Sequence, residues 1–221
     1  MAYDFNKIAS NYDRLNHIMT LGMDRLWRRR SVKRLISGFI HKPKVLDIAC
    51  GTGDMMVELT TQGCDVIGVD LSEEMLAIAA QKCKAPTMIA DAEQLPFPDA
   101  SFDAVTCAFG IRNFVHLEKG LSEMSRVLKP SGQLVLIELA TPDSPLVRPF
   151  YNLYTRHIIP QLGKRLAGNR EAYTYLPTSI ERFPKGKAML SKLSAAGFQP
   201  QEHKYFFGVC RLYHCQLLPQ Q

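Results

Sequence analysis

The chain has 221 residues, of which 46% are hydrophobic and 22% charged, and its formal net charge is +6. This composition is typical of a soluble globular protein with its own core, and it excludes disorder as the main state. The apolar runs are far shorter than the ~18 residues of a membrane-spanning helix, and charged residues interrupt any signal-peptide core, so we expect a cytoplasmic protein. The six cysteines form no C-x-x-C pair and the six histidines are dispersed, so we expect neither a disulfide framework nor a metal site.

Residues 1–43 are predicted to form an N-terminal helical cap. Residues 1–44 carry ten Lys/Arg against three Asp/Glu, and the segment DRLWRRRSVKR at 24–34 places six basic side chains beside apolar ones. Such a stretch favours an anionic partner, either lipid headgroups or nucleic acid. A solvated helix face is the alternative interpretation.

Residues 44–140 alternate short apolar runs with helix-like stretches. The expected strands are 44–49, 65–69, 86–90, 102–107 and 133–139, and the expected helices are 53–62, 73–83 and 118–128. Several runs lack polar alternation, which is typical of parallel strands covered on both faces. The pattern predicts an α/β fold with a doubly wound, mainly parallel sheet that forms a cofactor-binding core.

The remaining segments are predicted to complete a single domain over residues 1–221. Prolines interrupt an amphipathic run in residues 141–184, which indicates a helical insert over the strand ends. A helix is expected at 183–196, where Gly197 ends it, and two short strands around Gly208 follow. The first and last parts of the chain are basic, whereas residues 45–140 carry six Lys/Arg against fourteen Asp/Glu and would favour a cationic ligand.

The sharpest local motif is VLDIACGTGD at 45–54, in which a strand leads into a glycine turn and a helix. Gly51 and Gly53, with Thr52 between them, allow a turn tight enough for a ligand to lie against the backbone. The dinucleotide fingerprint requires a third glycine, but Met56 stands at that position. This substitution argues against a nicotinamide cofactor.

Asp47, just before the turn, also argues against a pyrophosphate. A carboxylate there would repel phosphate oxygens, whereas S-adenosylmethionine has no phosphate and presents an ammonium and a sulfonium. The sign of the charge therefore favours S-adenosylmethionine. A buried structural aspartate is the alternative.

Two further carboxylates follow the next strands. Asp70, followed by Leu71, ends the second strand, where a carboxylate can accept hydrogen bonds from both ribose hydroxyls. An N-cap is the other possible role, but Ser72 fills that position better. Asp91 and Ala92 follow the third strand, where Asp91 can accept from an adenine amino group and Ala92 leaves room for the ring; an acidic surface turn is the alternative.

These motifs together resemble class I S-adenosylmethionine-dependent methyltransferases. The segments are VLDIACGTGD, VIGVDLSEEML, DAEQLPFPDASFDAV and RVLKPSGQLV. More narrowly, residues 5–29, FGIRNF at 109–114 and residues 151–184 resemble the C-methyltransferases of menaquinone and ubiquinone biosynthesis. The resemblance implies a Rossmann-like, seven-stranded sheet, S-adenosylmethionine as cosubstrate and no metal.

The sequence departs from this family at three places. Ala108 replaces a serine and removes one hydroxyl that would contact the cofactor. Met23 and Asp24 stand where the family has a histidine before Arg-x-Trp, and residues 207–213 replace a Gly-Gly-Ile-Val-Ala-Leu-His pattern. These departures bear on substrate-side geometry more than on the reaction class.

The resemblance implies methylation of a ring carbon of a polyprenylated hydroquinone, demethylmenaquinol to menaquinol, with the benzoquinol step of ubiquinone biosynthesis as the alternative. Arg112 is the first candidate to hold the phenolate, because arginine stays cationic and donates in a fork; pairing with a carboxylate is its alternative. Asn113 is expected to hold a ring oxygen or a water. Weaker candidates are Tyr12 and Asp13 over the cofactor, Tyr154 and Tyr173 against the ring, and His116 as a proton acceptor.

A lipid-soluble substrate implies peripheral contact with an anionic membrane at the inner face of the cytoplasmic membrane. The apolar stripe Phe150, Leu153, Tyr154, Ile158 and Leu162 would form a groove, and the cations of residues 25–34 would attract headgroups. No nucleic-acid partner is expected, because the chain lacks the motifs of exocyclic-amine and cysteine-dependent nucleic-acid methyltransferases. A methyltransferase for RNA or another small molecule, a non-catalytic cofactor-binding protein and a homodimer stay open.

Overall fold

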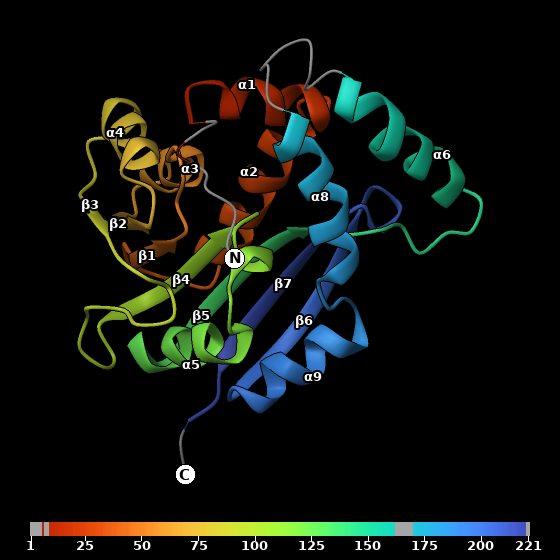
Figure 1. Ribbon diagram of the computed structural model, residues 1–221. Coiled ribbons are helices and arrows are strands. Elements are labelled where there is room, and N and C mark those ends of the chain that lie inside the picture. Colours follow the sequence, from red (N-terminus) through yellow and green to blue (C-terminus); the bar gives the residue numbers. More distant parts are fainter. Residues whose placement is uncertain (1–5, 7–8, 162–169, 220–221) are drawn as a thin grey trace.

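The computed structural model describes residues 6, 9–161 and 170–219. At its centre lies a seven-stranded sheet with the order β3-β2-β1-β4-β5-β7-β6 (Figure 1). The strands are β1 Lys44–Ile48, β2 Asp65–Asp70, β3 Thr87–Ile89, β4 Phe102–Ala108, β5 Leu128–Leu139, β6 Phe198–Tyr205 and β7 Cys210–Leu217. The first five run parallel, and β7 is antiparallel to both β5 and β6. The prediction of a doubly wound, mainly parallel sheet is confirmed.

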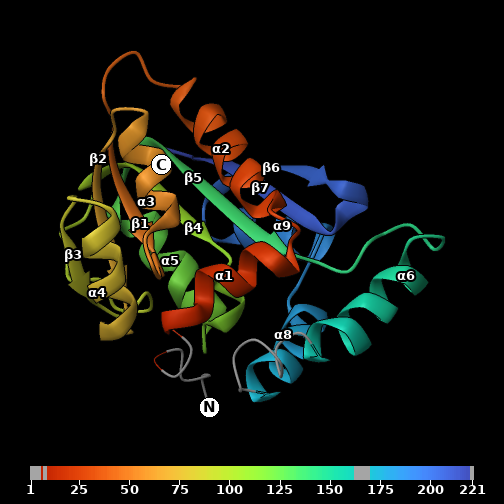
Figure 2. The same ribbon diagram turned by 90° about the horizontal axis from the view of Figure 1, so that it is seen from above.

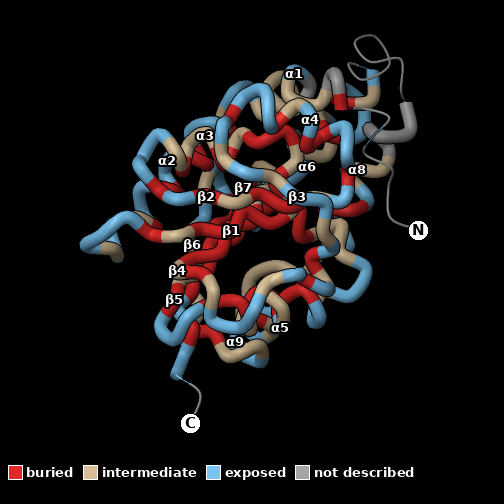
Figure 3. Tube along the Cα trace, turned by 90° about the vertical axis from the view of Figure 1, so that its left-hand side faces the viewer, coloured by how far each residue is buried: buried red, intermediate tan, exposed pale blue. Residues whose placement is uncertain are grey.

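Helices cover both faces of the sheet, whose buried strands lie between two helical layers (Figure 3). The helices are α1 Ala9–Met19, α2 Met23–Ile36, α3 Asp54–Thr61, α4 Glu73–Lys82, η2 Ile111–Asn113, α5 Leu117–Val127, α6 Arg148–Leu153, η3 Tyr154–Ile158, α8 Arg170–Arg182, α9 Lys187–Ala195 and η4 Phe206–Gly208. One core cluster joins α2, α3 and α4 to the sheet, and a second joins α5 and α9 to its other face. α6, η3 and α8 form a helical insert that stands apart from these layers (Figure 2).

Two predicted elements differ from the structure. The helix expected at 183–196 is wrong at its start, because α8 ends at Arg182 and α9 begins at Lys187. Between them Pro184 lacks an N–H donor, and Gly186 has a φ of 57°, which no helix adopts. β5 also begins at Leu128 instead of residue 133, because Leu128 pairs with Phe102 before the register shifts.

The basic segment 24–34 forms α2, but its cations do not share one exposed face. Arg28 is only 6% exposed, and its Nη1 lies 2.5 Å from Oδ2 of the buried Asp24. Trp27 and Val32 are buried against the sheet. The expectation that Arg28 faces headgroups is therefore wrong. Among the described helices, none is both long and apolar enough to cross a membrane.

Candidate functional site

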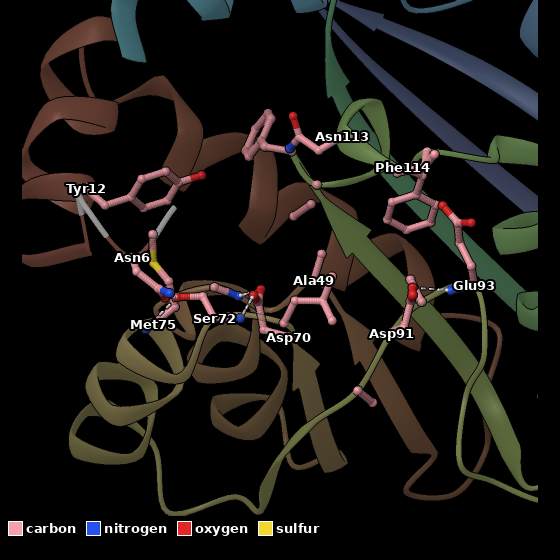
Figure 4. Close-up of a pocket in the computed structure, with 18 residues that line it drawn as sticks. Asn6, Tyr12, Ala49, Asp70, Ser72, Met75, Asp91, Glu93, Asn113 and Phe114 are labelled. Atoms are coloured by element: carbon pink, nitrogen blue, oxygen red, sulfur yellow. Dashed lines mark hydrogen bonds between the residues drawn. The ribbon is translucent and has the colours of Figure 1, made fainter. Parts of the chain in front are cut away.

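The first cavity lies at the carboxyl ends of the parallel strands and has a volume of about 270 Å³. Tyr12 and Phe114 stand at opposite sides of the view in Figure 4, with Ala49 and Asp70 between them. The residues predicted from sequence that line this cavity are Tyr12, Gly51, Asp70, Leu71, Asp91, Ala92, Ala108 and Asn113. The strand ends therefore bring most of the predicted cofactor-binding residues together.

Asp70 shapes the turn that forms the floor of this cavity. Its Oδ2 accepts the N–H of Gly51 at 2.8 Å, and its Oδ1 accepts the N–H of Ser72 at 2.9 Å. Burial raises the pKa of Asp70, while these backbone N–H groups act in the opposite direction. Each oxygen retains a lone pair for a ligand hydroxyl. Ser72 caps α4 by accepting the N–H of Met75, so the N-cap role falls to Ser72, as the sequence predicted.

Of the three residues in the glycine turn, Gly51 lines the cavity, whereas Thr52 and Gly53 lie behind it. Gly51, at a φ of +56°, lines the cavity, and a Cβ there would meet nothing within 4 Å. At Gly53 a Cβ would lie 3.0 Å from Cβ of Ala79, so this glycine lets α3 approach α4 closely. Thr52 is buried, and its hydroxyl donates to Asp13. Thr52 and Gly53 therefore support the turn and do not line the cavity.

Asp47 also lies behind the cavity. It is 1% exposed; Thr106 donates to its Oδ1 at 2.6 Å, and its Oδ2 has no hydrogen-bond partner in the structure. Burial raises the pKa of Asp47 to about 7, while the Thr106 hydroxyl favours ionisation. Asp47 is thus only partly ionised near neutral pH, so its charge discriminates less between a cationic cofactor and a phosphate than the sequence suggested.

The far end of the cavity is formed by the turn after β3. Asp91 is exposed and accepts the N–H of Glu93 at 2.8 Å, whereas Ala92 is buried beside it. Asp91 is therefore both an acidic surface turn and a cavity residue. Glu93 and Phe114 line the same end. Both lie in segments that the sequence analysis compared with the family, DAEQLPFPDASFDAV and FGIRNF, but neither residue was given a role.

α1 closes over this cavity through ionic contacts. Asp13 pairs with Lys82 of α4, and Nζ of Lys82 lies 2.8 Å from Oδ1 of Asp54. Asn6 accepts a hydrogen bond from the Ser72 hydroxyl. Asp13 thus fastens α1 and does not line the cavity, whereas Tyr12 does.

A second, largely apolar cavity of about 330 Å³ lies between α1, α2 and the helical insert. Tyr12 and Phe109 line both cavities and so form a shared wall. Burial raises the pKa of Tyr12, with Arg112 acting in the opposite direction, so its hydroxyl stays protonated at neutral pH. Phe109 has a φ of 61° just after β4; it begins the FGIRNF segment, but the sequence analysis gave it no role.

Arg112 lines the second cavity and is held by a carboxylate. Its Nη1 lies 2.7 Å from Oε1 of Glu138 and also donates to the carbonyl of Phe109, while its Nε has no partner. Burial alone would lower the pKa of Arg112, but Glu138 and Tyr12 raise it overall. Arg112 therefore pairs with a carboxylate, which was the alternative role expected from the sequence, and it still lines the apolar cavity. Glu138 was missed, although a lone carboxylate in the apolar run 133–139 was a signal.

The other residues that the sequence predicted on the substrate side do not all lie in one cavity. Asn113 lines the first cavity and accepts the Tyr175 hydroxyl at 2.9 Å through its Oδ1. Tyr154 lines the second cavity and donates to the carbonyl of Met19 at 3.1 Å. His116 precedes α5 and lines neither cavity. The side chain of Tyr173 lies outside the described residues.

One cluster brings together metal-ligating groups that are dispersed in the sequence. Ligand atoms of His17, Asp24 and Asp54 lie within 4.8 Å of one another. The same carboxylates also contact Arg28, and Lys82 pairs with Asp54. Both cations therefore contact the carboxylates of this cluster, which joins α1 to α2 and α3 as an ion network.

The strand order, the glycine turn and the Asp70 position define a class I S-adenosylmethionine-dependent methyltransferase fold. A SAM-dependent methyltransferase of Thermotoga maritima aligns with a TM-score of 0.66 and 20% identity, covering 96% of this chain and 97% of that one. The magnesium protoporphyrin IX methyltransferase of Synechocystis, solved with bound SAH, aligns with a TM-score of 0.60 and 19% identity over 87% of this chain and 83% of that one. These likenesses concern the fold, which they confirm.

Sequence comparison defines the family more narrowly. The demethylmenaquinone methyltransferases of Deinococcus radiodurans and Thermus thermophilus are each 42% identical over 95% of this chain, covering 89% and 97% of those proteins. The ubiquinone/menaquinone biosynthesis C-methyltransferase UbiE of Bartonella bacilliformis is 39% identical over 95% of this chain and 85% of that protein. Residues 2–216 match the ubiE/COQ5 methyltransferase family, and the chain belongs to this family.

Proposed function

We propose that this protein methylates a ring carbon of a polyprenylated hydroquinone with S-adenosylmethionine as cosubstrate, converting demethylmenaquinol to menaquinol. The observation that carries the proposal is the shared wall of Tyr12 and Phe109 between a polar cavity at the strand ends and an apolar cavity. A donor in the first cavity and an aromatic acceptor in the second would meet at this wall. The names of relatives that match nearly the whole chain support a quinone acceptor.

The first cavity fits S-adenosylmethionine by its chemistry. Asp70 offers acceptors for the ribose diol, Gly51 leaves bare backbone open to a ligand, and Asp91 and Ala92 suit an adenine amino group and ring. Leu71 and Ala108 add apolar contacts, and among the described residues that line the cavity none has a basic side chain that would bind a phosphate. When bound, the cofactor supplies an electrophilic methyl group.

We assign to Arg112 the role of stabilising the phenolate form of the acceptor ring. A neutral aromatic carbon is a weak nucleophile, but loss of the phenol proton, with a pKa near the value of about 10 for tyrosine, moves charge onto the adjacent carbon. That carbon would form the bond to the methyl group as the methyl–sulfur bond breaks and its electron pair goes to sulfur. The hydrogen on the carbon then leaves as a proton to water, and its bonding pair restores the aromatic ring. From the second cavity, Arg112 favours the phenolate by its fixed positive charge and Tyr154 packs against the ring. Asn113 lines the first cavity, so we assign it a water or a ring oxygen that reaches past the shared wall.

Membrane contact is proposed to follow from the acceptor's tail. The cations of α2 other than Arg28 are exposed, and none of them forms an ion pair with another described residue: Arg25, Arg29, Arg30, Lys33 and Arg34. Phe150, Leu153 and Ile158 of the predicted apolar stripe are also exposed, whereas Leu162 lies outside the described residues. We assign the protein to the cytoplasm with transient binding at the inner membrane face, with no nucleic-acid partner.

Mass spectrometry of quinones tests the proposal. The purified protein would be incubated with S-adenosylmethionine and vesicles that contain either demethylmenaquinol or the corresponding benzoquinol. We expect one methyl group to be added to the naphthoquinol ring carbon, at a rate that EDTA leaves unchanged. Methylation of the benzoquinol alone would reverse the substrate choice, and methylation of neither quinol would refute the proposal.

A further inference from the structure

Three exposed apolar elements surround the mouth of the second cavity. Leu21, in the turn between α1 and α2, is 76% exposed; Phe150 of α6 is 75% exposed; and Phe206, in the β6–β7 turn, is 55% exposed. All three residues line the cavity, so they form its rim. The β6–β7 turn and α6 lie on the same side of the molecule in two perpendicular views (Figures 1 and 2).

The apolar surface continues outward from this rim. Phe207 is 65% exposed and packs edge-on against Phe206, with ring centroids 5.7 Å apart, but it does not line the cavity. Leu153 is exposed three residues after Phe150, which places both on the same face of α6, and Leu146 is exposed in the turn that precedes this helix. Contiguous apolar surface of this kind on a folded protein marks an interaction site.

The backbone of the rim is strained where these side chains are exposed. Leu21, Phe206 and Phe207 have φ values of 52°, 45° and 56°. Left-handed conformations cost a non-glycine residue roughly 1–2 kcal/mol, so glycine or asparagine would suit these positions of the four-residue β6–β7 turn better than phenylalanine. Apolar residues retained in strained, exposed turns indicate that the side chains themselves are used.

The cavity size and the surrounding charge identify the partner. A volume of about 330 Å³ is at the small end of ligand pockets, roughly 300–1,000 Å³, so a ring system fills it and an attached prenyl tail must leave through the mouth. Arg30 and Arg34 lie close enough to act electrostatically on Tyr205, the residue before the β6–β7 turn. Cations therefore flank the apolar surface, as at an anionic bilayer boundary.

We propose that Leu21, Leu146, Phe150, Leu153, Phe206 and Phe207 form a docking surface that inserts into an anionic lipid bilayer around the mouth of the second cavity. The β6–β7 turn supplies an aromatic wedge, and the acceptor's tail passes between this turn and α6 without entering water. The proposal rests on the proposed function only for the identity of that tail. Membrane binding itself follows from the surface.

Vesicle co-sedimentation tests the docking surface without any substrate. Phe207→Asn removes the apolar ring but tolerates the left-handed turn, so this variant should fold. We expect wild-type protein to bind phosphatidylcholine vesicles that contain phosphatidylglycerol, and Phe207→Asn to lower the partition coefficient about tenfold. Leu146→Ser should act in the same direction. The matched control is Ile40→Ser, because Ile40 is fully exposed before β1, at the opposite ends of the strands.

Unchanged partition in both variants would overturn the proposal. A change in the light-scattering mass of Phe207→Asn with unchanged vesicle binding would also overturn it, because the surface would then join two copies of the chain. Methyl transfer gives a second readout: Phe207→Asn should slow transfer to quinol embedded in vesicles and leave transfer to a tail-less quinol in water unchanged. If no variant methylates either quinol, the proposed function fails while the vesicle result still stands.

Discussion

Arg112 and Glu138 form a buried ion pair in which Nη1 lies 2.7 Å from Oε1. Glu138 also accepts the backbone N–H of Arg112 and of Leu139, so its carboxylate fixes both the turn after β4 and the guanidinium. Arg112 also donates to the carbonyl of Phe109, a residue of the wall shared by the two cavities, so in the proposed function this pair would set where positive charge meets the ring. Glu138 is therefore a positioning residue for Arg112.

Replacing Glu138 by glutamine should leave Arg112 as a buried charge without its counter-ion. We expect Glu138→Gln to cost roughly 3 kcal/mol in the free energy of unfolding and to lower turnover, with little change in the affinity for S-adenosylmethionine. Denaturant unfolding and steady-state kinetics measure these effects. The matched control is Glu181→Gln, whose exposed pair with Arg156 should contribute at most about 1 kcal/mol. Equal stability losses in the two variants would contradict the assignment.

Asp70→Ala should weaken S-adenosylmethionine binding about 10- to 100-fold. The variant removes charged acceptors for the ribose, worth roughly 1.5–3 kcal/mol, and frees the N–H of Gly51. Calorimetry with the cofactor measures the loss. Asp65→Ala is the control, because Asp65 is exposed at the opposite end of the same strand. Equal affinity in wild type and Asp70→Ala would remove Asp70 from the cofactor site.

Asp47→Asn should change how stability depends on pH. Burial raises the pKa of Asp47 from 3.8 to about 7, so the folded protein keeps a proton that the unfolded chain loses between about pH 4 and pH 7. This group's contribution to stability is therefore largest below that window and is lost as pH rises through it. Asparagine does not titrate, so the stability of the variant relative to wild type should rise from pH 4 to pH 7. Parallel pH profiles of unfolding would show that Asp47 ionises normally.

Lys82→Ala should loosen α1 over the cofactor cavity. Lys82 bridges Asp13 of α1 and Asp54 of α3, and its side chain is partly exposed, so the loss of stability should be small. Tyr12 would then be held less firmly at the cavity. We expect a several-fold faster release of S-adenosylmethionine in stopped-flow measurements, most clearly at low salt. Arg156→Ala breaks an exposed pair elsewhere and should leave the release rate unchanged.

The sequence predicted the parts of the site that depend on neighbouring residues along the chain. Asp70, Asp91 and Ala108 reach one cavity because parallel strands end at the same edge of the sheet, and strand ends are visible in the sequence. Thr52 was misjudged because its partner, Asp13, depends on how α1 packs. The partner of Arg28, in contrast, is Asp24 in the same helix four residues earlier, a spacing that the sequence shows.

The substrate side was less predictable for the same reason. Glu138 is 26 residues from Arg112, and only the pairing of β4 with β5 brings them together. The β6–β7 turn and the helical insert line the second cavity together, although they are far apart in the sequence. Long-range packing of this kind leaves no local pattern in the sequence.

Arg112→Lys tests most directly whether the paired cavities carry out methyl transfer to a phenolate. Lysine keeps the charge but loses the fork, so S-adenosylmethionine affinity should stay within about twofold while turnover falls about 100-fold or more. The measurement is calorimetric cofactor binding together with methyl transfer to demethylmenaquinol by the same preparation. Undiminished turnover in Arg112→Lys and in Arg112→Ala would contradict the account.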